Sequence, residues 1–271
     1  MKQATQQATA AEMIGRCEAL GSEADRKILS WFFKTGPGQY GEGDRFLGIR
    51  VPATRTLVRE YRGRLPMDEI GLLIASKWHE VRLAGFLLLV AEMEAAVARP
   101  RGAGKFARQS AEVPAVLAGR RKEIVDFYLA NARQANNWDL VDLSCPYILG
   151  AYLLAPGPDG QLPPRDILDR LAASTNLWEQ RIAIVATLAL IRAGQFDDTL
   201  RIAETLLPHS HDLIHKATGW MLREVGKRDT GVLTAFLRAH YASIPRTTLR
   251  YAIEKFPAPV RKAWLAGPVV D

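Results

Sequence analysis

The sequence is poor in cysteine, and this scarcity excludes several classes of protein. Cys17 and Cys145 are the only thiols in a chain of 271 residues, and they form no C-x-x-C pair. Two distant cysteines are too few for a disulfide framework or a zinc–thiolate site. We therefore expect a protein of a reducing compartment, the cytoplasm.

The sequence also lacks a long hydrophobic run. The longest nearly apolar stretch, residues 182–191, is about half the length that a membrane span needs. The first ten residues carry one lysine and no apolar segment, which is not the pattern of a signal peptide. We expect neither a membrane anchor nor a membrane partner.

Neither sign of charge dominates, and glycine and proline are scattered. Lysine and arginine number 36 against 29 acidic residues, and the formal net charge is +7. This excess is a weak indication of a polyanionic partner. The 21 glycines and 15 prolines are too dispersed for a disordered or collagen-like chain. We predict a disordered segment over residues 1–9 and a single domain over residues 10–271.

Apolar residues follow a helical spacing almost everywhere, and no segment alternates as a strand does. Pro146 predicts a kink or break inside one of the helices. The apolar residues predict helices over residues 10–20, 23–34, 52–63, 67–75, 78–97, 112–133, 137–153, 165–174, 177–192, 196–207, 211–226, 229–240, 246–256 and 259–265.

Helices this short, joined by short connections, cannot each bury an apolar face alone. Stacking as antiparallel pairs solves this problem, and it produces an α-solenoid of the HEAT-like or armadillo-like type. We therefore predict an all-α solenoid, and a compact helical bundle is the alternative. The helix over residues 177–192 is apolar almost all round, so we expect it to be an inner helix.

Two motifs suggest a bound cofactor or metal, and both are incomplete. Residues 36–41 match G-x-G-x-x-G, but a helix is predicted before them where a dinucleotide site needs a strand. His211 and His215 are four residues apart, with His209 nearby, but Asp212 replaces the glutamate of H-E-x-x-H. We expect a mobile surface loop and a helix N-terminus with exposed histidines, with no metal or cofactor.

Two tryptophans lie beside charged residues at helical spacing. Trp138 and Asp142 are four residues apart and share a helix face, and Asp139 precedes Asp142 by three. Trp178 and Arg181 occupy the first turn of another helix, where a cation opposes the helix dipole and could meet an anion. The alternatives are a cap-and-core pair for the first cluster and a salt bridge for the second.

A third tryptophan lies within a basic stripe. Lys216, Trp220, Arg223 and Lys227 are spaced by four, three and four residues, along one side of a helix. Cations around an aromatic ring are typical of a nucleic-acid groove. A solvated basic face with a half-buried indole is the structural alternative, and a peptide-binding scaffold is another functional one. Together the three clusters predict a concave, basic, aromatic-lined groove.

In five segments the chain resembles the AlkD-type DNA alkylation repair family. The members of this family are DNA glycosylases built of HEAT-like repeats. The resemblance spans residues from about 24 to 257. The segments are FLGIRVP at 46–52, NWDLVD at 137–142, WEQRIA at 178–183, KATGWMLRE at 216–224 and RTTLRYAIEKF at 246–256.

The resemblance implies hydrolysis of the N-glycosidic bond of cationic alkylated purines, of the 3-methyladenine and 7-methylguanine type, in duplex DNA without base flipping. Such a base already carries positive charge, so it leaves as a neutral molecule without a general acid. One carboxylate can stabilise the oxocarbenium-like sugar and position a water. Indole faces beside the sugar add cation–π attraction. Neither a metal nor a cofactor is needed.

The resemblance also implies roles for individual residues. Asp142 resembles the catalytic carboxylate, Trp138 and Trp220 the indoles beside the sugar, and Arg181 a backbone contact. Trp31 is a looser match to an N-terminal aromatic of the groove. We expect a monomer in the cytoplasm, nucleoid-associated if bacterial, with alkylated duplex DNA as its partner and no obligate protein partner. A non-catalytic nucleic-acid-binding protein with the same groove is the alternative. The remaining predicted DNA contacts are Trp178, Lys216, Arg223 and Lys227.

Overall fold

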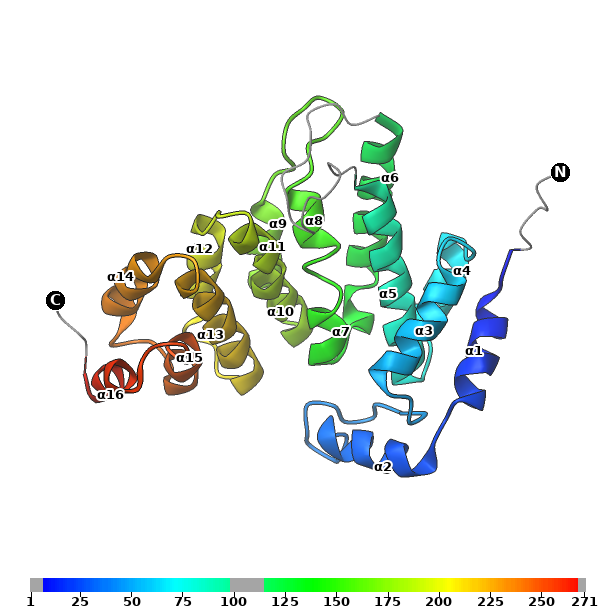
Figure 1. Cartoon of the computed structure of the whole chain (residues 1–271), viewed down its shortest axis with the longest axis horizontal. Helices are drawn as coiled ribbons and strands as arrows, with labels where there is room; N and C mark the ends of the chain where they lie inside the picture. Colours follow the sequence, from blue (N-terminus) through cyan, green and yellow to red (C-terminus); the bar gives the residue numbers. More distant parts are fainter. Residues whose placement is uncertain (1–6, 98–114, 268–271) are drawn as a thin grey trace. The chain divides into compact units, whose positions relative to one another are not determined.

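The computed structural model describes residues 7–97 and 115–267, and in these residues the fold is all-helical (Figure 1). No strand forms in the described part; one isolated bridge joins Arg45 and Trp78. Helices close in sequence pack on one another, as in a helical solenoid. The predicted all-α fold is confirmed. No helix in the described ranges has both the length and the apolar character to cross a bilayer.

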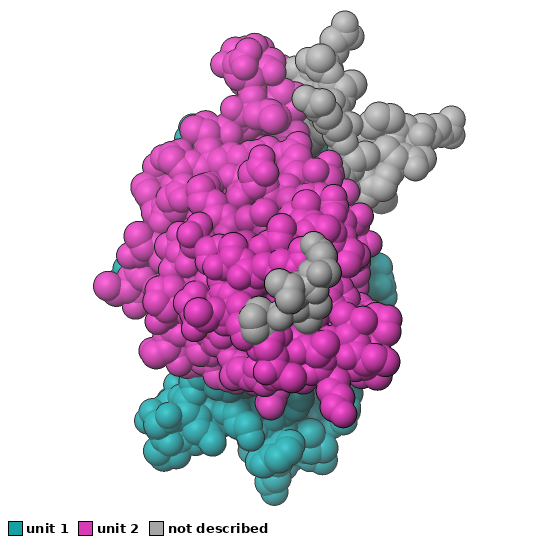
Figure 2. Space-filling model, turned by 90° about the vertical axis from the view of Figure 1, so that its left-hand side faces the viewer, with its two compact units in different colours: residues 1–97, 120–144 teal, residues 98–119, 145–271 magenta. Residues whose placement is uncertain are grey.

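The chain divides into two compact units, coloured separately in Figure 2. Unit 1 comprises residues 1–97 and 120–144, and unit 2 comprises residues 98–119 and 145–271. The prediction of one domain over residues 10–271 stays a prediction. Of the segment predicted to be disordered, residues 1–6 lie outside the described part. Ala8 is buried and its N–H donates to the Arg64 carbonyl, and Thr9 caps the first helix, so packing begins before residue 10.

Unit 1 is built around one long helix, α5, which is buried on most of its faces. Gly85 of α5 brings it close to α4, because a Cβ there would lie 2.8 Å from Ile74. Phe86 of α5 contacts Tyr128 of α6 edge to face. The helices of unit 1 are α1 (Ala10–Ala19), α2 (Glu23–Phe32), α3 (Val51–Tyr61), α4 (Met67–Ile74), α5 (His79–Ala96), most of α6 (Ala115–Ala130), the 3-10 turn η1 (Ala132–Gln134) and α7 (Trp138–Asp142).

Unit 2 has its core along α10 and α11, which are buried almost all round, as the sequence predicts for an inner helix. Gly219 lets α13 and α15 approach closely, because a Cβ there would lie 2.6 Å from the Thr248 carbonyl oxygen. The helices of unit 2 are α8 (Leu149–Leu153), α9 (Asp166–Ala172), α10 (Leu177–Ala186), α11 (Leu188–Arg192), α12 (Asp197–Leu206), α13 (Asp212–Gly226), α14 (Thr230–His240), α15 (Arg246–Ala252) and α16 (Ala258–Ala266).

The predicted helix boundaries are mostly correct, with one informative exception. The break expected near Pro146 is present, because α7 ends at Asp142 and α8 begins at Leu149. The inner helix predicted as continuous over 177–192 is interrupted at Thr187. There the threonine hydroxyl donates to the Ile184 carbonyl at 2.6 Å and competes with the helical backbone bonds.

Candidate functional site

The candidate site in unit 1 begins with α7, a helix of only five residues. Asn137 caps it, since its side-chain oxygen accepts the Trp138 N–H at 2.9 Å. Trp138 and Asp142 are both half-buried, and their spacing of four residues puts them on one face. Asp139, by contrast, is buried. The short helix thus keeps one carboxylate inside unit 1 and the other partly accessible.

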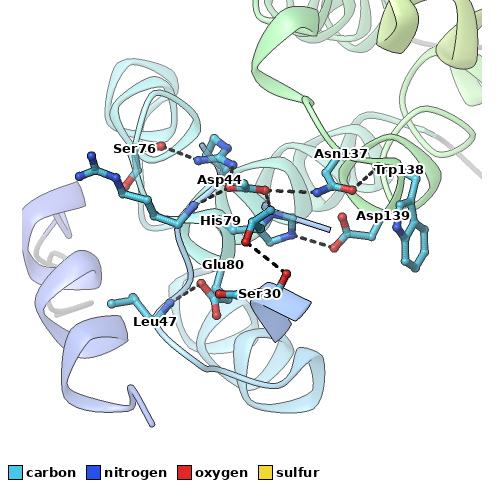
Figure 3. Close-up of polar contacts among 12 residues, drawn as sticks. Ser30, Asp44, Leu47, Ser76, His79, Glu80, Asn137, Trp138 and Asp139 are labelled. Atoms are coloured by element: carbon cyan, nitrogen blue, oxygen red, sulfur yellow. Dashed lines mark hydrogen bonds and ion pairs between the residues drawn. The ribbon is translucent and has the colours of Figure 1, made fainter. Parts of the chain in front are cut away.

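The buried Asp139 leads into a network of charged groups, shown in Figure 3. Nε2 of His79, on α5, is 2.9 Å from Oδ2 of Asp139. The other ring nitrogen, Nδ1, is 2.7 Å from Oδ2 of Asp44, which lies in the connection between α2 and α3. The His79 side chain is 2% exposed. One imidazole therefore joins three segments that are remote in sequence.

Asp44 is held by two further donors. Nη2 of Arg82 donates to its Oδ1 at 2.5 Å, and Nδ2 of Asn137 donates to its Oδ2 at 3.3 Å. Burial alone would raise the pKa of Asp44, but the hydrogen bond from His79 and the charges of His79 and Arg82 hold it below its usual value. Asp44 is therefore a permanent carboxylate at neutral pH.

His79 is an imidazolium in this environment. Burial would lower its pKa, but the carboxylates of Asp139 and Asp44 outweigh burial and raise the pKa to about 9. Geometry requires the same state, because both ring nitrogens face acceptors and only the protonated ring donates from both. With Arg82, the two cations balance the two carboxylates, which keeps a buried cluster neutral overall.

An aromatic column fixes the indole of Trp138. Phe33 stacks on it, with ring centroids 5.4 Å apart, and Phe32 meets its edge at 6.1 Å. Phe33 also stacks on Phe46 at 5.1 Å and lies 4.9 Å from the His79 ring. Such contacts add to the area buried by each ring. The column ties Trp138 to the segment that follows α2.

The glycine-rich loop over residues 36–44 is anchored at its end, and its expected mobility stays a prediction. Helix α2 precedes it, so it lacks the strand of a dinucleotide site. The N–H of Gly38 donates to Glu42, and the N–H of Gly41 donates to the Lys34 carbonyl. The loop carries Asp44 into the buried network.

Glu80 holds the next part of the same connection. Its carboxylate accepts the backbone N–H groups of Leu47, Gly48 and Ile49, at 2.8 to 3.0 Å. Its side chain does not bond to α7. Glu80 therefore stabilises the segment leading into α3, separately from the network around His79.

Trp31 is the most exposed large side chain near the aromatic column. It is 73% exposed, and the Lys34 ammonium lies 4.9 Å from its ring centroid. It shares α2 with Phe32, which is half-exposed and touches Trp138. The predicted N-terminal aromatic thus belongs to the same unit as Trp138 and Asp142.

In unit 2, Trp178 and Arg181 are more buried than a surface contact with DNA suggests. Asn176 caps α10 by accepting the N–H groups of Trp178 and Glu179. Trp178 is 8% exposed and Arg181 is 5% exposed. Nη1 of Arg181 donates to the Leu213 carbonyl at 2.6 Å, which links α10 to α13. Arg181 therefore bonds to the backbone of α13, and the salt bridge considered as an alternative stays a prediction.

The basic stripe on α13 is matched by carboxylates. Lys216 pairs with Asp212 at 2.7 Å. Arg223 pairs with Glu254, which follows α15. Lys227 lies 2.6 Å from Glu224. Trp220 lies between these cations and is half-buried. The sequence shows the cations of the stripe, whereas the structure shows that each already has an anionic neighbour.

The three histidines near α13 are engaged in local bonds. Nδ1 of His211 accepts the Leu213 N–H and caps α13, and Nδ1 of His209 accepts the His211 N–H. His215 bonds to the His209 carbonyl. Burial lowers the pKa of both His209 and His211. No cluster of metal-ligating side chains occurs in the described residues.

The predicted site residues therefore fall into two groups. Trp31, Trp138 and Asp142 belong to unit 1. The groove that would join them to unit 2 stays a prediction. The buried network could not be predicted from the sequence, because Asp44, His79 and Asp139 are far apart along the chain and no local pattern links them. The members in unit 2 of the predicted site are Trp178, Arg181, Lys216, Trp220, Arg223 and Lys227.

Comparisons with known proteins agree with this fold. A family model described as DNA alkylation repair enzyme matches residues 14–256. Among solved structures, the chain is similar to one described as a predicted DNA alkylation repair enzyme from Enterococcus faecalis, with a TM-score of 0.60 at 15% identity. That similarity covers 88% of this chain and 97% of the other. At this identity it shows the fold alone. No curated protein matches the chain.

Proposed function

Because the chain belongs to the DNA alkylation repair enzyme family, we propose that it is a monofunctional DNA glycosylase that hydrolyses the N-glycosidic bond of cationic alkylated purines in duplex DNA. Membership of the family supports a role in DNA repair, and the reaction is our inference. The observation that carries it is the placement of Asp142. This carboxylate is half-buried, one helical turn from a half-buried indole, on a short helix anchored from inside unit 1.

The two carboxylates of α7 have different environments, and this difference favours Asp142 as the reactive one. Asp139 is buried and bonded to His79, so its charge is engaged inside the protein. Asp142 is partly accessible and shares a face with Trp138. A group that stabilises a substrate cation must be reachable by the substrate, and Asp142 meets that condition.

The proposed reaction needs few groups besides Asp142 and Trp138. A purine alkylated at N3 or N7 leaves as a neutral base, so a general acid is unnecessary. The carboxylate of Asp142 would stabilise the oxocarbenium-like sugar and orient the attacking water. The face of Trp138 would add cation–π attraction as positive charge develops on the sugar. The reaction requires no lysine nucleophile, so strand cleavage by a lyase step is not expected.

DNA binding is assigned to residues of both units. In this proposal Trp31 and Trp220 contact the duplex near the lesion, and the stripe of Lys216, Arg223 and Lys227 contacts phosphates. Because these cations have anionic neighbours, binding must exchange some intramolecular ion pairs for contacts with phosphate. Affinity should therefore be moderate and should fall with salt.

The charge of the lesion provides the test of this function. Duplexes containing 7-methylguanine or 3-methyladenine should release free base, whereas duplexes containing the neutral lesion hypoxanthine should not. The expected product is an abasic site in an unbroken strand. Equal release of neutral and cationic bases would contradict the mechanism. Tight, salt-sensitive binding with no release from any duplex would favour the non-catalytic DNA-binding alternative.

A further inference from the structure

The attachments of α7 inside unit 1 converge on one side chain of α5. The ring of His79 bonds to Asp139 on α7 and to Asp44 at the end of the glycine loop. From this arrangement we infer that His79 is a positioning residue, which fixes the orientation of Trp138 and Asp142 by holding α7 through Asp139. This inference rests on the proposed function, since Asp142 is the reactive group there.

The length of α7 makes such an anchor necessary. A helix of five residues has few backbone bonds of its own, and isolated helices of this length are unstable in water. Its cap, Asn137, is itself bonded to Asp44, which His79 also holds. Two residues of this segment therefore depend on the same imidazole. Asp139 bonds to it directly, and Asn137 is linked to it through Asp44.

The Asp139 carboxylate depends on His79 in particular. Its Oδ2 faces the imidazole, and its buried Oδ1 has no hydrogen-bond partner within the described residues. Without His79, a buried carboxylate would lose the partner that compensates it. An unpaired buried carboxylate raises the free energy of the folded state. We therefore expect α7 to move until Asp139 reaches water.

The charges around His79 stabilise its two hydrogen bonds, one to Asp44 and one to Asp139. Asp44 and Asp139 face it from other segments, while Arg82 and Glu80 share its helix. Arg82 bonds to Asp44, and Glu80 is engaged with backbone amides. Only the protonated ring donates to both carboxylates at once.

The aromatic column acts on the same residues. The His79 ring stacks on Phe46 at 4.4 Å and lies 4.9 Å from Phe33, which stacks on Trp138. A shift of the imidazole would therefore disturb the indole through Phe33 as well as through Asp139. The polar contact of Asp139 and the aromatic contact of Trp138 therefore both fix the position of α7.

The first experiment measures chemistry and binding separately in His79→Gln. A neutral amide donates to one carboxylate and turns its oxygen toward the other, so the attachment is broken on one side. Because a displacement of about 1 Å can cost about 100-fold in rate, single-turnover base release should fall by about that factor. The dissociation constant for duplex DNA should stay within about threefold, since a side chain as buried as His79 is out of reach of bound DNA.

A double variant provides the rescue. In His79→Gln with Asp139→Asn, two neutral amides can bond to each other, and no buried carboxylate lacks a partner. Base release should recover at least tenfold over His79→Gln alone. Glu92→Gln is the matched control, because Glu92 lies on the same helix, α5, and its carboxylate accepts from Arg120 of α6, where the amide oxygen of glutamine can still accept. It should keep nearly the rate of the native protein.

Amide hydrogen exchange in the free protein separates this inference from the proposed function. The amides of Val141 and Leu143 bond within α7, to the carbonyls of Asn137 and Asp139. Their protection should fall in His79→Gln and not in Glu92→Gln. If the native protein releases no base, the proposed function fails. The hydrogen exchange of Val141 and Leu143 still tests whether His79 anchors α7. Unchanged protection in His79→Gln, or equal loss of rate in Glu92→Gln, would overturn the inference.

Discussion

At the scale of single residues, the protonation of His79 contributes to the stability of unit 1. Its raised pKa, about 9, is well above the unfolded value of about 6.5. The folded protein therefore holds this proton more tightly than the unfolded chain does, and proton binding stabilises the fold. Asp44 has the opposite shift, since its pKa is lowered in the folded state.

These shifts predict how stability depends on pH. The contribution of His79 is fully present below about pH 6.5 and is lost as the pH rises through about 9, with an upper limit of about 3 kcal/mol. The contribution of Asp44 is present above about pH 4 and is lost as the pH falls through its lowered pKa. Urea unfolding between pH 7 and 10 measures the first. The double variant His79→Gln with Asp139→Asn should lose less stability over this range, and an equal loss would contradict the assignment.

The ion pair of Arg223 with Glu254 yields a prediction for DNA binding. Glu254→Gln removes the anion that competes with phosphate for Arg223, so duplex affinity should rise about fivefold. Arg223→Ala should weaken binding to all sequences alike and flatten the salt slope by about one charge. Fluorescence anisotropy across a salt series measures both.

Glu204→Gln is the control for net charge, because Glu204 is exposed on α12. It makes the same change in charge away from the stripe. Should it raise affinity as much as Glu254→Gln does, the effect would belong to the overall charge rather than to Arg223.

At the scale of helices, local patterns predicted most of the fold, and long-range contacts account for what they missed. Asn176 accepts backbone N–H groups at the start of α10, a signal contained within a few residues. The bond between Asn137 and Asp44 joins residues 93 positions apart, and no periodicity reports it. His79 begins a helix like many others. Its role becomes visible only when Asp139 and Asp44 meet its two nitrogens.

The contact between α13 and α15 gives a prediction about stability. In Gly219→Ala the new Cβ would lie 2.5 Å from Cβ of Tyr251 and 2.6 Å from the Thr248 carbonyl, so the helices must separate. We expect a loss of about 1–3 kcal/mol in the free energy of unfolding. Trp220 is the next residue, so base release should fall as well.

The matched control for this helix contact is Gly15→Ala. Gly15 is exposed in α1, and a Cβ there would meet no atom within 4 Å. Alanine favours a helix interior over glycine by about 1 kcal/mol, so this variant should be slightly more stable than the native protein. If Gly219→Ala behaved like Gly15→Ala in urea unfolding, close packing of α13 and α15 would be disproved.

At the scale of the whole molecule, the family resemblance and the fold agree, while the assembly of the site across both units is our proposal. Segments resembling the family were visible in the sequence because they are contiguous, as in residues 137–142. Their chemistry depends on contacts between different segments, which no single motif shows. The carboxylates beside the α13 stripe are an example, because Glu254 lies outside that helix.

The most direct test of the central claim is base release from methylated duplex DNA by the native protein and by Asp142→Asn. The account predicts that the native protein releases 7-methylguanine, and that Asp142→Asn loses at least about 100-fold in single-turnover rate. The variant should keep its duplex affinity. Asp126→Asn, which neutralises an exposed carboxylate on α6, is the control and should match the native rate. Full activity in Asp142→Asn would contradict the account.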